Sequence, residues 1–327
     1  MIPLFKLWAA TAALFWASAA PAQDKPARVG WLTLQNEGRY EQITARGFVE
    51  GLREAGYVEG RNLVFVRRSA DTDIKRLRPL AKEIVAAGVD VFFAPAKPMA
   101  DAAWYASRKL PTVIATVTDP VAVDYAVSLA RPGKQITGVT TANAELIGKR
   151  MQLLGELVPG LKRLGVFIDP ALYASCAEEV DLMEKAGRTL GISVVHIPVV
   201  YSRNTDLATA LKRAVAAKVQ AVMTAPMTHN QDITDRLAEQ ALAERMPYVH
   251  DVPQLAGQAL AVYGPDFEDI YRRAGHYVAR ILKGEQPAQM AIEEPRQFRL
   301  IVNAGVARQL GLKLSPSVLA RADEVIQ

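Results

Sequence analysis

The sequence predicts an α/β protein built from two doubly wound, Rossmann-like lobes that are joined by a multi-crossover hinge. Three observations support this. Short apolar segments alternate with amphipathic helical segments, and this pattern begins twice, near residue 28 and again near residue 144. The length of 327 residues suggests two domains. The composition, with 50% hydrophobic and 22% charged residues, provides enough apolar side chains for two cores.

The first array of elements follows the N-terminal segment. Ile43, Gly47, Phe48 and Leu52 recur at helical spacing, so they mark the buried face of one helix. Strands are expected at 28–34, 63–67, 89–94, 112–116 and 136–139, with helices at 40–55, after Asp73 to about 87, and at 98–109. Apolar strands separated by helices are typical of a parallel sheet covered on both faces, with ligands bound beyond the carboxyl ends of the strands.

The second array begins after Gly138. Strands are expected at 164–168, 194–199, 221–224 and from 248, with helices at 144–158, 175–190, 205–217 and 232–245. The last part adds a strand at 260–263, a helix at 267–282, an extended linker at 286–295, a strand at 298–302, a helix at 303–310 and a short tail at 314–327. These elements are too few for a third domain and are expected to pair with the edges of both sheets. The chain would then cross between the lobes more than once, which makes a hinge.

We therefore expect residues 24–140 and about 252–285 in the first lobe, and residues 141–251 and about 296–327 in the second. The segment from 112 to 138 contains two strand ends and two turns. Asp119 and Pro120 are expected at a strand tip on the floor of the cleft, and Arg131-Pro132-Gly133 leads into the first crossover.

The first 22 residues differ from the rest of the chain. Lys6 precedes an apolar run at 7–19, and Ala20-Pro21-Ala22 fits a small-x-small cleavage site. This pattern predicts a secretory signal peptide that is too short for a stable membrane span. No cysteine follows the apolar run, so a lipoprotein anchor is not expected. The mature chain is expected in the periplasm.

Composition and motifs argue against several functions. Cys176 is the only cysteine, which excludes an internal disulfide. The formal charge of +5 comes from scattered Lys and Arg, so no nucleic-acid partner is expected. The sequence has no phosphate-binding loop, zinc-protease motif or nucleophile elbow, and we expect no cofactor and no catalysis. His229, His250 and Asp251 remain an alternative metal site, although no metal is our expectation.

Four segments carry a resemblance to a known family: GFVEGLREAGYVEGRNLVFVRR (47–68), TDPVAVDYAVSLARPGKQITGV (118–139), KRMQLLGELVP (149–159) and FRLIVNAGVARQLGLKLSPSVLARADEVIQ (298–327). In this order they resemble the ABC-transporter substrate-binding proteins that include tryptophan and tyrosine binders. The resemblance implies a type I periplasmic-binding-protein fold, a small-molecule ligand, an inner-membrane ABC permease as partner and a monomer. The loop at 169–175 departs from the Asn-rich family pattern and leaves open whether the ligand is an aromatic amino acid.

An amino acid or similar small carboxylate needs a helix N-terminus or hydroxyls for its carboxylate, a buried acid for its ammonium, and an apolar wall. The candidate ligand-binding residues on the strand-to-helix loops are Gln35, Asn36, Tyr40, Ala96, Lys97, Thr118 and Asp119 in the first lobe, and Tyr173, Ser175, Thr224, Met227, His250 and Asp251 in the second. Asp119 and Asp251 are the preferred ammonium partners.

Alternatives remain open for several of these residues. Asp119 is equally explained as part of an Asp-Pro turn, Asp251 as a hinge residue and Tyr173 as a contact between the lobes. At the level of function, a ligand-sensing subunit of a membrane receptor or kinase is the alternative to an importer component. An exported enzyme is less favoured.

Overall fold

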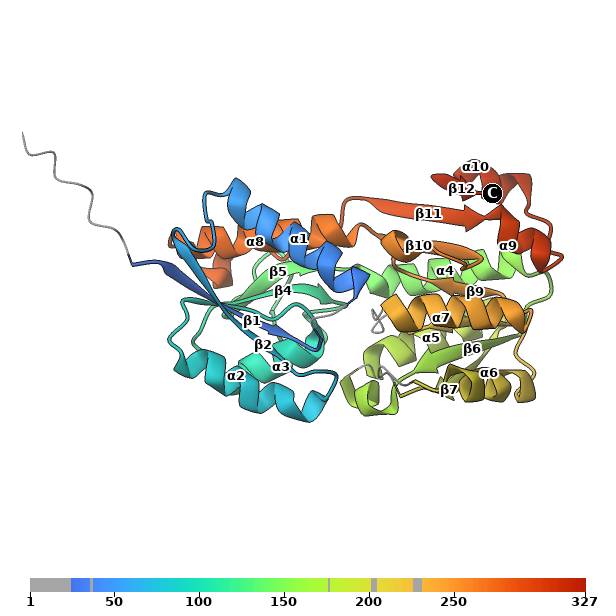
Figure 1. The fold of residues 1–327 in the computed structure, drawn as a ribbon, viewed down its shortest axis with the longest axis horizontal. Helices are drawn as coiled ribbons and strands as arrows, with labels where there is room; N and C mark the ends of the chain where they lie inside the picture. Colours follow the sequence, from blue (N-terminus) through green and yellow to red (C-terminus); the bar gives the residue numbers. More distant parts are fainter. Residues whose placement is uncertain (1–24, 36–37, 176, 201–204, 226–230) are drawn as a thin grey trace, which may run out of the picture.

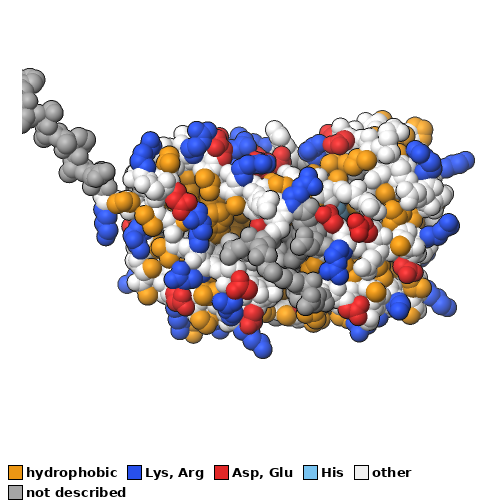
Figure 2. Space-filling model, viewed as in Figure 1, with side chains coloured by type: hydrophobic (Ala, Val, Ile, Leu, Met, Phe, Trp, Pro, Cys, Tyr) orange, Lys and Arg blue, Asp and Glu red, His pale blue; other side chains and the backbone are white. Residues whose placement is uncertain are grey.

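The computed structural model describes residues 25–35, 38–175, 177–200, 205–225 and 231–327, which form two lobes lying side by side (Figure 1). Each lobe is built on one sheet covered by helices, so the predicted α/β class and two-lobed architecture are confirmed. On the face drawn in Figure 2, Lys and Arg side chains are interspersed with Asp and Glu over both lobes and gather into no basic stripe among the described residues.

The first lobe contains a five-stranded sheet in the order β2-β1-β3-β4-β5, and all of its strand pairs are parallel. The strands are β1 (Ala27–Thr33), β2 (Leu63–Ser69), β3 (Val91–Phe93), β4 (Thr112–Val117) and β5 (Ile136–Thr140). Successive side chains of a strand point to opposite faces of the sheet. Trp31 of β1 packs under α1 (Arg39–Glu54) and α8 (Phe267–Leu282). Leu32 packs on the other side, under α2 (Leu77–Ala86) and α3 (Lys97–Ala106), and the short helix η1 (Ile74–Arg76) precedes α2.

The second lobe contains a seven-stranded sheet in the order β12-β11-β10-β9-β8-β6-β7. Its strands are β6 (Arg163–Ile168), β7 (Ser193–Pro198), β8 (Ala221–Thr224), β9 (Tyr248–His250), β10 (Ala261–Pro265), β11 (Phe298–Asn303) and β12 (Glu324–Ile326). The pairing of β10 with β11 is antiparallel. One core lies under α4 (Asn143–Leu157) and α5 (Ala177–Leu190), and the other under α6 (Leu207–Ala216) and α7 (Gln231–Ala243).

The C-terminal part differs from the sequence prediction in three places. β10 falls inside 252–285, which we expected in the first lobe, but it pairs with β9 and β11 in the second sheet. The predicted tail contains α10 (Pro316–Arg321), whose N-terminus is capped by Ser315, and β12, which pairs with β11; both follow α9 (Ala304–Gln309). The predicted linker contains the short helix η4 (Pro287–Gln289). The elements α10, β12 and η4 are so short that periodicity does not reveal them, whereas β10 was expected as a strand and only its lobe differs.

Within the described residues, the chain passes between the two sheets three times: between β5 and α4, between β10 and α8, and between η4 and β11. The first and third passages are joined, because the Glu293 N–H donates to the Gly138 carbonyl at 3.0 Å and the Thr140 N–H donates to the Glu293 carbonyl at 2.9 Å. A further loop, with η3 (Pro253–Leu255), brings Val252 and Leu255 into the core of the first lobe. Among the described helices, none combines the length and apolar character needed to cross a membrane.

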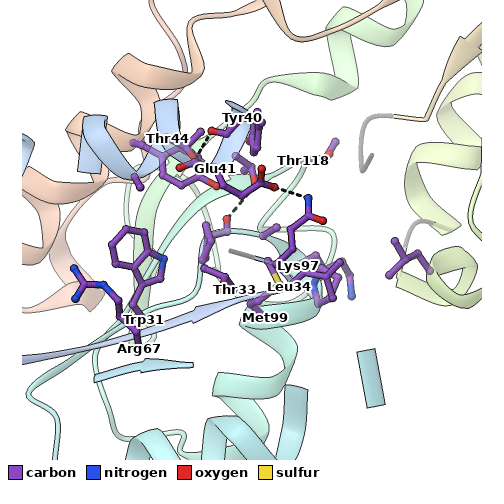
Figure 3. Close-up of a pocket in the computed structure, with 18 of the residues that line it drawn as sticks. Trp31, Thr33, Leu34, Tyr40, Glu41, Thr44, Arg67, Lys97, Met99 and Thr118 are labelled. Atoms are coloured by element: carbon purple, nitrogen blue, oxygen red, sulfur yellow. Dashed lines mark hydrogen bonds between the residues drawn. The ribbon is translucent and has the colours of Figure 1, made fainter. Parts of the chain in front are cut away.

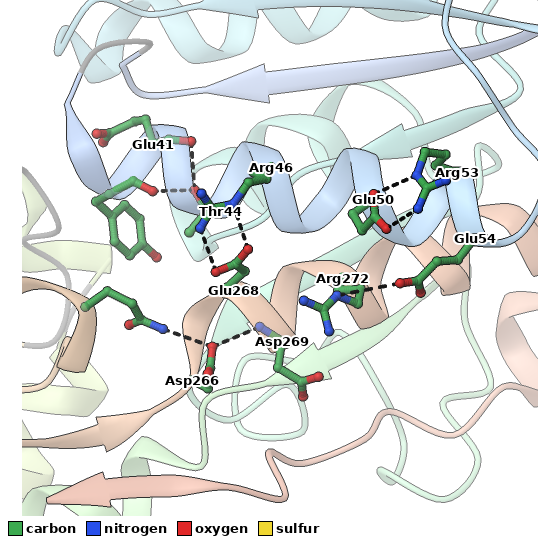
Figure 4. Close-up of polar contacts among 12 residues, drawn as sticks. Glu41, Thr44, Arg46, Glu50, Arg53, Glu54, Asp266, Glu268, Asp269 and Arg272 are labelled. Carbon is green, nitrogen blue, oxygen red and sulfur yellow. Dashed lines mark hydrogen bonds and ion pairs between the residues drawn. The ribbon is translucent and has the colours of Figure 1, made fainter. Parts of the chain in front are cut away.

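Helices α1 and α8 pack with almost no space between their backbones (Figure 4). A Cβ atom added to Gly51 would lie 1.9 Å from the Arg272 carbonyl oxygen, and one added to Gly275 would lie 2.4 Å from that of Phe48. Arg46 of α1 donates two hydrogen bonds, of 2.8 and 2.9 Å, to Glu268 of α8 at the edge of the same contact. The small residues therefore let the two helices behave as one unit over one face of the first sheet.

Candidate ligand-binding site

A cavity of about 350 Å³ opens at the carboxyl ends of β1, β3 and β4, where a doubly wound sheet is expected to bind ligands. In Figure 3, Tyr40, Glu41 and Thr44 of α1 lie above it, with Trp31 and Arg67 on one side and Lys97 on the other. The second lobe contributes Leu172 from η2 (Pro170–Ser175) and Glu179 from α5. The full lining consists of Trp31, Thr33, Leu34, Gln35, Tyr40, Glu41, Thr44, Ala45, Arg67, Pro95, Ala96, Lys97, Pro98, Met99, Thr116, Thr118, Leu172, Glu179 and Tyr271.

The N-terminus of α3 forms one wall of the cavity. Ala96 is its N-cap residue and supplies no side-chain cap. Lys97, Pro98 and Met99 of the first turn line the cavity, and Lys97 and Met99 carry backbone N–H groups there, whereas Pro98 has none. The Lys97 ammonium donates to Asp101 Oδ2 at 2.8 Å, and the other oxygen of Asp101 accepts from the Tyr125 hydroxyl. Burial and the neighbouring Asp101 raise the pKa of Tyr125, so this phenol stays protonated and fixes the carboxylate.

An aromatic wall lies opposite. The Trp31 ring packs edge-on against Phe48 and Phe93, with ring centroids 4.9 and 5.7 Å apart. The Arg67 guanidinium lies 5.4 Å from the Trp31 ring and makes a bidentate pair with Glu59. Trp31 Nε1 is buried and has no hydrogen-bond partner among the described residues. A buried donor of this kind is expected to meet an acceptor, which a bound ligand would supply.

On the first-lobe side of the cavity, the remaining wall consists of Tyr40 and Glu41 of α1 and Tyr271 of α8. Tyr40 is buried against Phe267 and Tyr271, and burial followed by the charge of Tyr271 raises the pKa of Tyr40 well above its ordinary value. Glu41 accepts a hydrogen bond from the Gln35 amide. This side therefore offers both neutral hydroxyls and a negative charge.

The second lobe faces this wall with the first turn of α5. Glu179 is only 4% exposed, and Glu178 beside it is partly buried. Burial first, then the negative charges of Glu179 and Asp119, raise the pKa of Glu178 to about 7, while Lys97 acts in the opposite direction. Because Asp119 and Lys97 belong to the first lobe, the charge state of Glu178 depends on how closely the lobes approach.

The model of the family described as ABC transporter substrate binding protein matches residues 33–326. The chain belongs to this family. The substrate-binding protein is 24% identical over 281 residues to the tyrosine-binding protein of Clostridioides difficile, covering 82% of this chain and 76% of the relative.

Two solved structures resemble this substrate-binding protein over 92% of its chain and 100% of theirs. A conserved domain protein from Vibrio cholerae has a TM-score of 0.80 at 27% identity. The ABC domain from Streptococcus pneumonia, solved in complex with L-Trp, has a TM-score of 0.81 at 22% identity. Both have the type I periplasmic-binding-protein fold that the sequence resemblance implied, and that expectation is confirmed.

The structure brings five of the predicted site residues of the substrate-binding protein to the cavity: Gln35, Tyr40, Ala96, Lys97 and Thr118. Gln35 follows β1, Ala96 and Lys97 follow β3, and Thr118 follows β4, while Tyr40 lies on the first turn of α1. These positions agree with the expectation that ligands bind beyond the carboxyl ends of parallel strands. Asn36 and Met227 lie outside the described residues, as does the side chain of Ser175.

The other predicted residues have different surroundings. Asp119 accepts from the backbone N–H groups of Val121 and Ala122 at 2.9 and 3.0 Å, so it stabilises its own turn. Asp251 lies 3.7 Å from the guanidinium of buried Arg150 on α4. Three more residues do not line the cavity either: Thr224, whose hydroxyl is 3.4 Å from that of Tyr248; His250, which is buried; and Tyr173, which is exposed beside the His196 ring.

Among the lining residues, sequence reasoning missed Trp31 and Arg67, which lie inside β1 and β2, and Glu179, which lies inside α5. Their only sequence signal is polarity or large size near the carboxyl end of a strand or the start of a helix. For the alternative metal site, His229 lies outside the described residues, and the part of the chain that the structure describes contains no group of three or more metal-ligating side chains.

Glu178→Gln is expected to raise thermal stability more at high pH than at low pH. The pKa of Glu178 in the folded protein, about 7, is above its ordinary value of 4.5, so folding favours the protonated form. The contribution of Glu178 to stability is therefore greatest at pH values below 4.5, the ordinary pKa that it has in the unfolded chain. This contribution is lost as the pH rises through about 7. Melting temperatures of both proteins at about pH 5 and about pH 8 test this.

The exposed Glu145→Gln provides the reference for removing one negative charge from the first turn of a helix. If the difference in melting temperature between Glu178→Gln and Glu145→Gln is the same at both pH values, Glu178 does not have a raised pKa in the folded protein.

Proposed function

We propose that this protein binds an amino acid or a similar small carboxylate between its lobes and delivers it to an inner-membrane ABC permease. It does so in the periplasm, after removal of residues 1–22. The observation that carries the proposal is the cavity of about 350 Å³, which has walls from both lobes. Its volume suits a small ligand. The tyrosine-binding relative and the neighbour in complex with L-Trp support an amino acid.

The chemistry of the walls supports a carboxylate at α3. The N-terminus of this helix, which has no side-chain cap, favours an anion. Trp31, Leu34, Met99 and Leu172 provide an apolar surface for the remainder of the ligand. The described lining contains no His, Cys or Ser, the side chains that most often act as nucleophile or base, which favours binding over catalysis.

Closure of the lobes would bury the ligand, and the permease would recognise the closed form. Ligand contacts come from α1 and α3 in one lobe and from η2 and α5 in the other, so a bound molecule stabilises the approach of the lobes by contacting both.

Mass spectrometry of the protein purified without denaturation identifies the ligand, and a fluorescence titration then tests the site. Trp104→Phe leaves Trp31 as the only tryptophan after residue 22, so ligand binding is expected to change the emission of an indole in the cavity wall. The same compound should raise the melting temperature by mass action.

Ala45→Phe, which fills the cavity, should abolish both effects, and Ala144→Phe on the exposed side of α4 should keep them. Loss of high-affinity uptake in cells that lack the protein tests the transport role. If no amino acid or small carboxylate changes emission or melting, the proposed ligand class is wrong. Unchanged uptake would reject the importer role alone.

A further inference from the structure

Glu179 is a buried carboxylate that has no partner among the residues that the structure describes. It is 4% exposed, its Oε2 atom is enclosed, and it makes no hydrogen bond or ion pair with any described residue. Its side chain nevertheless lines the cavity. A buried charge is costly unless another group pairs with it, so a carboxylate in this position is expected to have a complement.

The two cations of the described lining do not provide that complement. Lys97 is paired with Asp101 at 2.8 Å, and Arg67 is paired with Glu59, with the second hydrogen bond at 2.9 Å. Each positive charge at the cavity is therefore already balanced by a carboxylate outside the lining. Glu179 adds a negative charge that these pairs leave uncompensated.

We propose that Glu179 binds a positively charged group of the ligand, a protonated amine or a guanidinium, and thereby selects cationic or zwitterionic ligands over neutral and purely anionic ones. The proposal rests on the proposed function in one respect, that the ligand occupies this cavity. It replaces Asp119 and Asp251 as ammonium partners, because the first stabilises its own turn and the second faces Arg150.

The position of Glu179 gives this contact a second consequence. The anion-favouring end of α3 belongs to the first lobe, whereas Glu179 belongs to the second. A ligand with both charges would thus be held by its carboxylate in one lobe and by its cation in the other. Removing the cation from the ligand would weaken binding and closure together.

Paired ligands test the proposal by calorimetry. L-Tyrosine and L-tryptophan are compared with 4-hydroxyphenyllactate and indole-3-lactate, in which a neutral hydroxyl replaces the ammonium. The other amino acids, tyramine, putrescine, agmatine and benzoate complete the panel. The native protein is expected to prefer the amine of its best pair by at least about tenfold. Glu179→Gln should remove this preference by weakening the amine alone.

Two controls separate recognition from structure. Glu178→Gln changes the adjacent carboxyl and should keep the preference for the amine. Without ligand, Glu179→Gln should melt at the same or a higher temperature, because it removes an unpaired buried charge; a lower temperature would indicate a structural partner and overturn the proposal.

The remaining outcomes distinguish this proposal from the proposed function. Binding of benzoate or the hydroxy acids as tightly as the amines would overturn the role of Glu179 while the solute-binding function stands. Binding of tyramine or putrescine that Glu179→Gln abolishes would support the role of Glu179 while rejecting a carboxylate ligand. If none of the cationic compounds binds the native protein, the proposal fails.

Discussion

Asp251→Asn is expected to lower the free energy of unfolding by about 3–5 kcal/mol, because it leaves a buried guanidinium without its counter-charge. The Arg150 and Asp251 side chains are 0% and 4% exposed, and their charged atoms lie 3.7 Å apart. Burial lowers the pKa of Arg150, and the charge of Asp251 acts against this effect. The remaining hydrogen bond of Arg150, to Asn143 Oδ1 at 2.5 Å, is with a neutral group and does not replace the carboxylate.

Urea denaturation of three variants checks this prediction. The double variant Arg150→Met with Asp251→Asn should recover most of the loss, since it removes both charges from the interior. Glu145→Gln, which breaks the exposed pair with Lys149 on the same helix α4, should change stability by less than about 1 kcal/mol. If Asp251→Asn lowers the free energy of unfolding no more than Glu145→Gln does, the buried pair does not stabilise the fold.

Gly51→Ala should lower the free energy of unfolding by about 1–3 kcal/mol, the usual cost of overpacking a tight contact. The added methyl would lie 1.9 Å from a backbone oxygen of Arg272, and a main-chain atom cannot move aside as a flexible side chain does. The helices α1 and α8 would have to separate, which would disturb the core around Phe48 and Phe267.

Gly148→Ala on α4 is the matched control. It lies within a helix, has no atom within 4 Å of the new Cβ position, and should gain about 1 kcal/mol from helix propensity. Thermal or urea unfolding of both variants gives the comparison. Equal effects at the two glycines would mean that the α1–α8 contact adapts without cost.

The sequence was sufficient to predict the strands β1 to β11, because they are short apolar runs that alternate with amphipathic helices. Trp31 and Leu32, for example, point to opposite faces under different helix pairs, as strand alternation requires. The C-terminal assignments failed for a different reason. β12 and α10 are stabilised by pairing with β11 and packing on the second lobe, and neither contact has a local signal in so few residues.

The candidate site was predictable only where loops follow strand ends. Lys97 and Thr118 follow that rule, whereas Glu179 lies within a helix whose polar residues all resemble a solvated face. Asp119 and Asp251 were plausible ammonium partners by residue type. Their competing partners, the backbone N–H groups of a turn and an arginine 101 positions away in the chain, are properties of the folded structure.

The tight contact between α1 and α8 also bears on how motion reaches the ligand. A single residue, Asp266, separates the end of β10 in the second lobe from the start of α8, and α1 carries Tyr40, Glu41 and Thr44 of the cavity wall. Because glycine leaves the two helix backbones in direct contact, α8 cannot shift without carrying α1 along. A rotation of the second lobe would therefore move α8 and α1 together. This movement would displace the cavity residues on α1, because no flexible side chains lie between the two helix backbones at the glycines to accommodate it.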